Sequence, residues 1–192
     1  MLNPQDKYTL DEYWKLVETF PERKYEYVDG YIRMMTGGSP AHGQIAANLS
    51  YLFVSALRSS DCNVYSSDVA VQLTDDKCYY PDISVSCDPF DWTRKKALEA
   101  PSVVVEVLSP TTERIDKIEK LQVYQYYPTI QEILFVDSRK CYVEHHHRVS
   151  VSQWAVSLYR DRNDVVELAS IETRFSLREI YAKVYLELEA DS

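Results

Sequence analysis

Val103-Val104-Val105-Glu106-Val107-Leu108 is an almost continuously apolar stretch that is interrupted by one carboxylate. Pro101-Ser102 leads into it and Pro110 closes it, so the stretch predicts a central strand of a sheet that is covered on both faces. A carboxylate in such a strand loses its hydration, and it is seldom tolerated without a partner, a metal ion or a shifted pKa. Glu106 is therefore the residue on which we base the functional prediction.

The chain on the C-terminal side of this strand predicts a strand, helix, strand unit. Thr111 or Thr112 can cap a helix through Tyr127, and residues 130–136 form a buried strand. Such a unit usually makes a right-handed crossover between parallel strands, although a mixed sheet remains an alternative. Further strands are expected over 142–149, 154–159 and 165–170, followed by a helix that begins with the capping box of Ser176 and Glu179.

The chain on the N-terminal side predicts a short helix, a hairpin and a longer helix. Thr9 and Glu12 have capping-box spacing for a helix that ends before Pro21. Asp29-Gly30 is a strong hairpin signal between strands at 25–28 and 31–35. The prediction is completed by a helix over 42–59, strands over 64–73 and 82–86, and a polar surface excursion over 88–100.

Composition limits the class of protein. The chain has 192 residues, of which 45% are hydrophobic, so it can bury one core, and we expect a single domain. Its net charge of −9 argues against a nonspecific binder of polyanions or membrane surfaces. No secretory signal or stretch of about 20 apolar residues is present, so we expect a cytoplasmic protein without a membrane span. The four cysteines contain no CxxC pair, and we expect reduced thiols.

A second carboxylate is placed to act together with Glu106. Asp82, in Pro81-Asp82, comes directly before the alternating residues 83–86, which predict a neighbouring strand. Two carboxylates on neighbouring strands suit a hard divalent cation. The structural alternative is that Glu106 pairs with an arginine from elsewhere in the fold.

Several short motifs, taken in order, resemble the Uma family of restriction endonucleases, a branch of the PD-(D/E)XK nuclease-like superfamily. The resemblance covers about Glu12 to Val136 and rests on Tyr25–Gly30, Ser39–His42, Tyr80–Asp82, Val104–Thr111 and the pair Lys120 and Tyr124. It implies an α/β, restriction endonuclease-like fold with a mixed central sheet flanked by helices. It also implies Mg²⁺ (or Mn²⁺) as cofactor and cleavage of DNA phosphodiester bonds. The domain over 1–192 would then divide into an N-terminal helical brace (1–24), a nuclease core (25–138) and C-terminal strands and helix (139–192).

The resemblance also assigns roles to individual residues. Asp82 and Glu106 would hold the metal ion, and Glu26 could supply a third carboxylate. The position of the superfamily lysine is occupied by Leu108, and Lys120, on the following helix, looks like the migrated lysine. We expect its side chain to border the core. The alternative is that Lys120 only forms an exposed helical pair with Asp116.

Three further residues are predicted to be accessory. Tyr124 lies one helical turn beyond Lys120 on the same face. His42 could contact phosphate or water, with capping and packing as the alternatives, and Asp68 resembles an acidic position found in part of the family or is a turn residue. His145-His146-His147 is not expected to bind metal, because consecutive strand residues point to opposite faces.

The sequence therefore predicts a Mg²⁺-dependent endonuclease. The alternative is a catalytically inactive interaction or regulatory module that kept the fold, and in either case we expect a homodimer. A dimer could gather basic loops over one DNA duplex, which would offset the acidic balance of the chain. A cluster of Asp82, Glu106 and the Lys120 ammonium favours the enzyme, whereas a Lys120 side chain in solvent favours the module.

Overall fold

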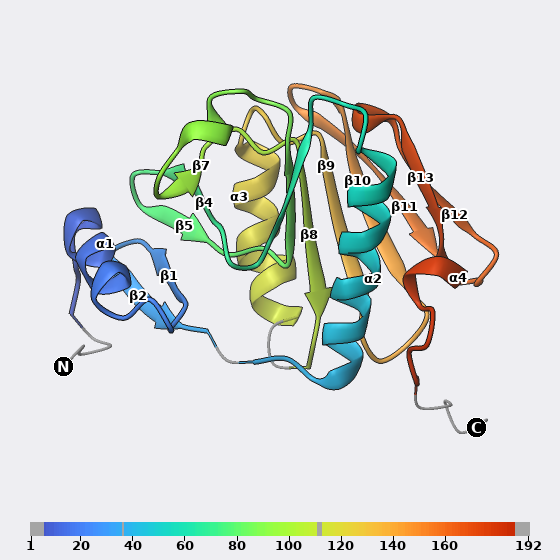
Figure 1. The fold of residues 1–192 in the computed structure, drawn as a ribbon, viewed down its shortest axis with the longest axis horizontal. Helices are drawn as coiled ribbons and strands as arrows, with labels where there is room; N and C mark the ends of the chain where they lie inside the picture. The colour runs from blue at the N-terminus through green and yellow to red at the C-terminus, as the bar shows by residue number, and fades with distance from the viewer. Residues whose placement is uncertain (1–5, 36, 111–112, 187–192) are drawn as a thin grey trace.

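The fold is built on two mixed β-sheets with helices against them (Figure 1), and the computed structural model describes residues 6–35, 37–110 and 113–186. The larger sheet has the order β11-β10-β9-β8-β6-β3. Only β8 and β9 are parallel among its described neighbours, so the predicted parallel pair is confirmed and lies in a mixed sheet. Its strands are β3 (Asn63–Ser66), β6 (Ile83–Ser86), β8 (Val103–Leu108), β9 (Glu132–Asp137), β10 (Val143–Ser150) and β11 (Gln153–Tyr159).

The smaller sheet has the order β2-β1-β5-β4-β7 and contains the predicted hairpin. Asp29 and Gly30 both have positive φ, as expected for the residues of such a turn. The strands are β1 (Tyr25–Val28), β2 (Tyr31–Met34), β4 (Ala70–Thr74), β5 (Lys77–Tyr79) and β7 (Ala97–Leu98). A separate ribbon pairs β12 (Val165–Leu168) with β13 (Thr173–Ser176).

The helices begin at the signals that the sequence carries. The predicted capping boxes at Thr9 and Ser176 are both formed, and Ser39 caps the long helix. The helical segments are α1 (Leu10–Thr19), α2 (Pro40–Ala56), the 3₁₀ turn η1 (Asp91–Thr93), the π-helical segment η2 (Ile115–Lys120), α3 (Leu121–Tyr126), the 3₁₀ turn η3 (Ala169–Ile171) and α4 (Leu177–Ile180). The predicted cap at Thr111 or Thr112 lies outside the described residues. No helix in the described ranges is long and apolar enough to span a membrane.

Strand β8 is buried on both faces, as predicted. Val103, Val105 and Val107 face a core cluster that includes the apolar side of α2. Val104 and Leu108 face a second cluster that includes α3, and Figure 1 shows α2 and α3 on either side of β8. Because side chains alternate along a strand, Glu106 shares the face of Val104 and points toward η2 and α3.

Two predicted segments differ from the structure. The strand over 64–73 is wrong, because a turn at Ser66 to Val69 divides it into β3 of the larger sheet and β4 of the smaller one. The surface excursion over 88–100 is wrong in part, because β7 and Asp91 are buried. The Asp91 carboxylate accepts hydrogen bonds from the backbone N–H groups of Glu99 and Ala100, so the loop folds around it.

The prediction of four reduced thiols is also wrong. Asn63 pairs with Ser86 in the register of β3 and β6, which brings Cys62 opposite Cys87. These two cysteines form a disulfide, while Cys78 and Cys141 are free.

Candidate active site

The predicted lysine lies inside a group of buried carboxylates. Lys120 Nζ is 2.9 Å from Glu26 Oε1, 3.0 Å from Glu106 Oε1 and 3.2 Å from Asp116 Oδ1. The three carboxylates come from β1, β8 and η2, so three parts of the fold meet at one ammonium group. The contact with Glu106 is a hydrogen bond, whereas Glu26 Oε1 is buried and accepts no hydrogen bond from the described residues.

Burial of Lys120 corrects two expectations. Its side chain is only 5% exposed, so it lies within the core and does not merely border it. Its pair with Asp116 is buried rather than exposed, and it is formed together with the contact to Glu106. The contacts of Lys120 with Glu106 and Asp116 therefore belong to one buried cluster, and the catalytic role of Lys120 stays a prediction.

Tyr124 completes the surroundings of Glu106. Its hydroxyl donates a 2.6 Å hydrogen bond to Glu106 Oε1, and its side chain is fully buried. Asp116, Lys120 and Tyr124 follow one another at intervals of four residues along η2 and α3, which places them on one helical face. That face covers Glu106.

Asp82 is held at the same end of β8 by two contacts. Its Oδ2 accepts a 2.7 Å hydrogen bond from Val107 N, and His42 Nε2 is 3.3 Å from the same oxygen. His42 comes from the first turn of α2, where Ser39 caps the helix. Gly38 leaves room for the imidazole, since a Cβ at Gly38 would come within 2.7 Å of the His42 ring.

A cleft of about 540 Å³ connects these groups. Asp82, Glu106, Asp116, Lys120 and His42 all contribute to its wall. The rest of the wall comes mainly from the segment before β1 and from the loop before α2: Glu22, Arg23, Lys24, Met34, Met35, Gly37, Gly38, Gly43, Ala46, Ser67, Val107 and Ser109. The cleft opens at the C-terminal end of β8, which is the lower end of that strand in Figure 1.

The pKa values follow from this arrangement. Burial raises the pKa of Glu106 well above its usual value. The charge of Lys120 lowers this pKa and the carboxylates of Asp116 and Asp82 raise it, and the net shift is upward. Burial disfavours the Lys120 ammonium, but the charges of Glu106, Glu26 and Asp116 outweigh it and raise the pKa of Lys120. The hydrogen bond with Asp82 raises the pKa of His42. The site thus carries more carboxylate than cationic charge.

This donor set fits a hard divalent cation. Within the described ranges, no three His, Cys, Asp or Glu side chains are arranged to hold a metal. Mg²⁺, however, is commonly bound by one or two carboxylates together with waters and substrate phosphates, so Asp82 and Glu106 are sufficient for such a site. Carboxylate oxygens also suit Mn²⁺. Burial is the main cause of the raised pKa of Glu106, and a divalent cation beside Asp82 and Glu106 would favour the ionised carboxylates.

The comparisons with known proteins agree with this geometry. Residues 10–179 match the Uma2 family, which is described as "Putative restriction endonuclease". The chain belongs to the Uma2 family. The sequence prediction of this family is therefore confirmed.

Relatives and a solved structure support the assignment to Uma2. An uncharacterized protein of Synechocystis sp. is 37% identical over 179 residues, which are 93% of each chain. A second uncharacterized Synechocystis protein is 30% identical over 165 residues, covering 84% of this chain and 92% of the relative. The crystal structure of a "putative nuclease" from Anabaena variabilis superposes with a TM-score of 0.73 at 20% identity, covering 92% of this chain and 99% of the other. The predicted restriction endonuclease-like fold is thus confirmed.

Not every predicted site residue of this Uma2 chain lines the cleft. Asp68 lies in the turn between β3 and β4, where it pairs with Lys24 at 2.8 Å and its side chain is 77% exposed. Tyr124 and Glu26 contact the cluster without forming the cleft wall. The His145 and His146 rings pair with Glu132 and Glu144, respectively.

Sequence reasoning missed two features of the site. Asp116 was predicted only as an exposed partner of Lys120. Its spacing of four residues from Lys120 was the signal that both side chains lie on one helical face. Arg33 on β2 pairs with Glu119 on η2, and Tyr79 donates a 3.1 Å hydrogen bond to Glu119. These contacts attach the hairpin that carries Glu26 to the helix that carries Lys120. They join distant parts of the chain, so no local pattern could have indicated them.

Proposed function

We propose that this Uma2 chain is a divalent-metal-dependent endonuclease that hydrolyses phosphodiester bonds of DNA with Mg²⁺ or Mn²⁺. The observation that carries the proposal is the position of Lys120 Nζ, 3.0 Å from Glu106 in the cleft that Asp82 also lines. Membership of a family described as "Putative restriction endonuclease" supports the reaction class.

Asp82 and Glu106 are the residues that would hold the metal ion. When bound, a divalent cation of this kind lowers the pKa of a water molecule and neutralises charge that develops on the phosphate. Val107 N and His42 keep the Asp82 carboxylate oriented toward the cleft. Tyr124 does the same for Glu106 through its hydroxyl.

Lys120 is the residue by which the protein itself contributes a positive charge to the cleft. Its ammonium donates to the attacking water or to a nonbridging oxygen of the scissile phosphate, in the role that a cationic donor has in stabilising developing negative charge. Glu26 and Asp116 keep it protonated, because their charges raise the pKa of Lys120. We propose His42, whose imidazole lines the cleft, as an accessory group that orients Asp82.

The inactive module is less well supported. A Lys120 side chain in solvent would favour it, whereas Lys120 is buried against Glu106. The homodimer, which either function could use, stays a prediction.

The test is cleavage of supercoiled plasmid DNA in Mg²⁺ by the wild type and by Asp82→Asn and Glu106→Gln. We expect nicking by the wild type that EDTA abolishes, and loss of nicking in both variants. Glu167→Gln, which removes an exposed carboxylate from β12, is the matched control and should cleave normally. A Glu106→Gln variant that nicks at the wild-type rate, or a wild type that never nicks, would contradict the proposal.

A further inference from the structure

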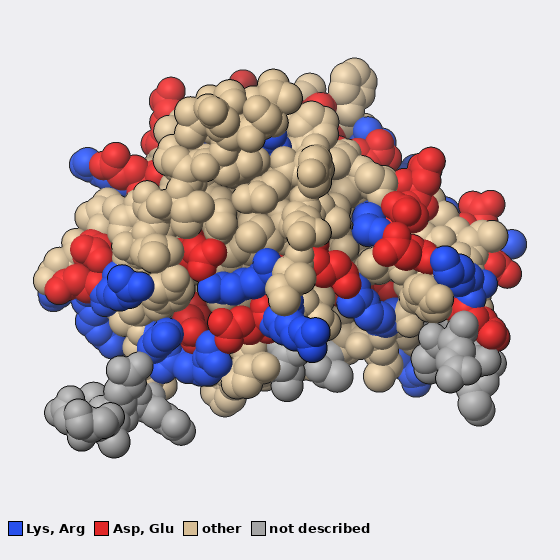
Figure 2. Space-filling model, turned by 180° about the vertical axis from the view of Figure 1, so that it is seen from behind, with Lys and Arg blue, Asp and Glu red and all other residues tan. Residues whose placement is uncertain are grey.

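Three cationic side chains surround Tyr142, just before β10. The Lys140 and Lys117 Nζ atoms lie 5.4 and 5.5 Å from the centre of its ring, and the Arg160 guanidinium carbon lies 5.5 Å away. Distances of this size are typical of cation–π contacts. Figure 2 shows Lys and Arg side chains gathered along the lower margin of the molecule on its rear side, with acidic groups between them.

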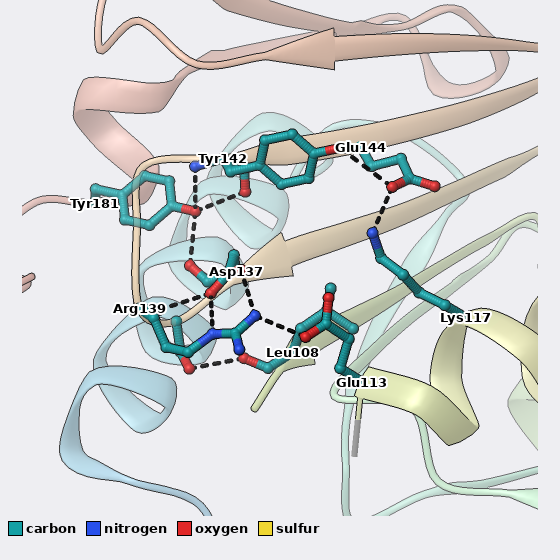
Figure 3. Close-up of polar contacts among 9 residues, drawn as sticks. Leu108, Glu113, Lys117, Asp137, Arg139, Tyr142, Glu144 and Tyr181 are labelled. Atoms are coloured by element: carbon teal, nitrogen blue, oxygen red, sulfur yellow. Dashed lines mark hydrogen bonds and ion pairs between the residues drawn. The ribbon is translucent and has the colours of Figure 1, made fainter. Parts of the chain in front are cut away.

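The cations of this region differ in whether a carboxylate compensates them. Lys117 Nζ is 2.6 Å from Glu144, and Arg139 pairs with both Asp137 and Glu113 (Figure 3). Lys117 and Arg139 are therefore largely neutralised by their partners.

Lys140 and Arg160 are different. Neither forms a salt bridge with any residue in the described parts of the chain, and both are exposed. In the adjacent turn, Asp164 Oδ2 accepts hydrogen bonds from the backbone N–H groups of Arg160 and Asp161 and forms no salt bridge with the Arg160 guanidinium. Two charges are thus left to interact with an outside anion.

These charges lie at the same edge of the sheet as the catalytic cleft. Leu108 pairs with Asp137 in the register of β8 and β9, and Asp137 N donates to Tyr142 O. Tyr142 is therefore two strands away from β8 and level with Leu108, which is two residues beyond Glu106. With strands about 4.8 Å apart and a rise of about 3.3 Å per residue, the backbones of Tyr142 and Glu106 are roughly 12 Å apart.

We propose that Lys140 and Arg160, held around Tyr142, form a phosphate-binding surface for the backbone of the DNA duplex whose scissile bond lies in the cleft. This inference rests on the proposed function and adds the place where the substrate is held. A chain with net charge −9 needs such a local cationic surface, because most of its surface repels a polyanion.

The surface suits backbone contact and not base stacking. Cations lie over the Tyr142 ring, and the Tyr142 hydroxyl donates to Glu144 at 3.3 Å, so the ring is engaged within the protein. Phosphate contacts of this kind position DNA without reading its sequence.

The experiment measures binding of a fluorescein-labelled DNA duplex by anisotropy in EDTA, which prevents metal-dependent cleavage, over a range of salt concentrations. The variant is Lys140→Ala/Arg160→Ala. The matched control is Arg58→Ala/Lys95→Ala, which removes the same two charges from exposed positions that form no salt bridge among the described residues, one after α2 and one before β7. Equal thermal midpoints verify that both variants are folded.

Each lost phosphate contact lowers the slope of log affinity against log salt by about 0.9. We expect the Lys140→Ala/Arg160→Ala variant to lose a slope of about 1.8 and roughly 60-fold in affinity at 0.1 M salt, since each contact contributes about 8-fold there. Lys140→Arg/Arg160→Lys should keep the wild-type slope, and so should the control. An unchanged slope in the alanine variant, or an equal loss in the control, would overturn the inference.

The outcome is separable from that of the proposed function. If the wild type nicks DNA and the alanine variant keeps the wild-type salt slope, the nuclease proposal stands and the phosphate-binding surface is overturned. Binding that depends on Lys140 and Arg160 in a protein that never nicks DNA would retain the surface and overturn the nuclease.

Discussion

The replacement of Lys120 by methionine tests the cluster most directly. Lys120→Met keeps a long apolar side chain but removes the ammonium that lies within 3.2 Å of Glu26, Glu106 and Asp116. The three buried carboxylates then lose the cation that they share. They must take up protons or admit water, and either response costs stability.

The expected loss of stability in Lys120→Met follows from the burial of the Lys120 ion pairs. Removal of one partner from a buried ion pair costs about 3–5 kcal/mol. For a chain of this size, about 1 kcal/mol shifts the thermal midpoint by about 2–4 °C, so we expect Lys120→Met to lower the midpoint by roughly 6–20 °C. Lys117→Met is the matched control, because Lys117 is only partly buried and, among the described residues, forms a salt bridge with one carboxylate, Glu144. A contact of that kind contributes about 0–1 kcal/mol.

The assay is thermal unfolding followed by circular dichroism, together with plasmid nicking. The double variant Glu106→Gln/Lys120→Met should regain part of the lost stability, because it removes one of the uncompensated carboxylates, but it should not regain nicking. A midpoint for Lys120→Met within about 2 °C of the wild type would refute the claim that one ammonium compensates the cluster.

Three further predictions concern residues around the site. Gly38→Ala should reduce nicking with little change in thermal midpoint, because the added Cβ displaces the His42 ring from Asp82; normal nicking would show that this contact is dispensable. Burial acts to raise the pKa of Asp137, but hydrogen bonds and charge from Arg139 hold this pKa below its usual value. The ionised Asp137 therefore stabilises the folded protein above about pH 4, and this contribution is lost as the pH falls through the lowered pKa of the folded state. Arg139→Gln should therefore destabilise the protein at pH 7 more than at about pH 2 in urea unfolding, and equal losses at both would contradict the assignment. A reductant should lower the thermal midpoint of the wild type but not of Cys62→Ser, since the disulfide closes a loop with a sequence separation of 25 and contributes about 3 kcal/mol.

Local patterns in the sequence were sufficient for much of the fold. The capping boxes at Thr9 and Ser176 and the Asp29-Gly30 turn depend on interactions within a few residues, so they can be predicted without knowledge of the rest of the chain. The apolar residues around Glu106 indicated a buried strand, and the alternation of side chains assigns Glu106 to one face. Asp82 was selected by its place before a strand next to that of Glu106, and Lys120 by the resemblance to a family, and the structure brings both to the cleft.

Only the tertiary structure decided how these pieces combine. The division of 64–73 between two sheets, the Cys62–Cys87 disulfide and the contact of Arg33 with Glu119 all join segments whose pairing no local pattern encodes. The burial of Lys120 has the same origin, because its surroundings come from β1 and β8 as well as from its own helix. Spacing along the helix could predict that Lys120 faces Asp116. Whether that face meets water or two more carboxylates depends on the packing of the hairpin against the helix, and this packing determines both the charge state and the stability of the site.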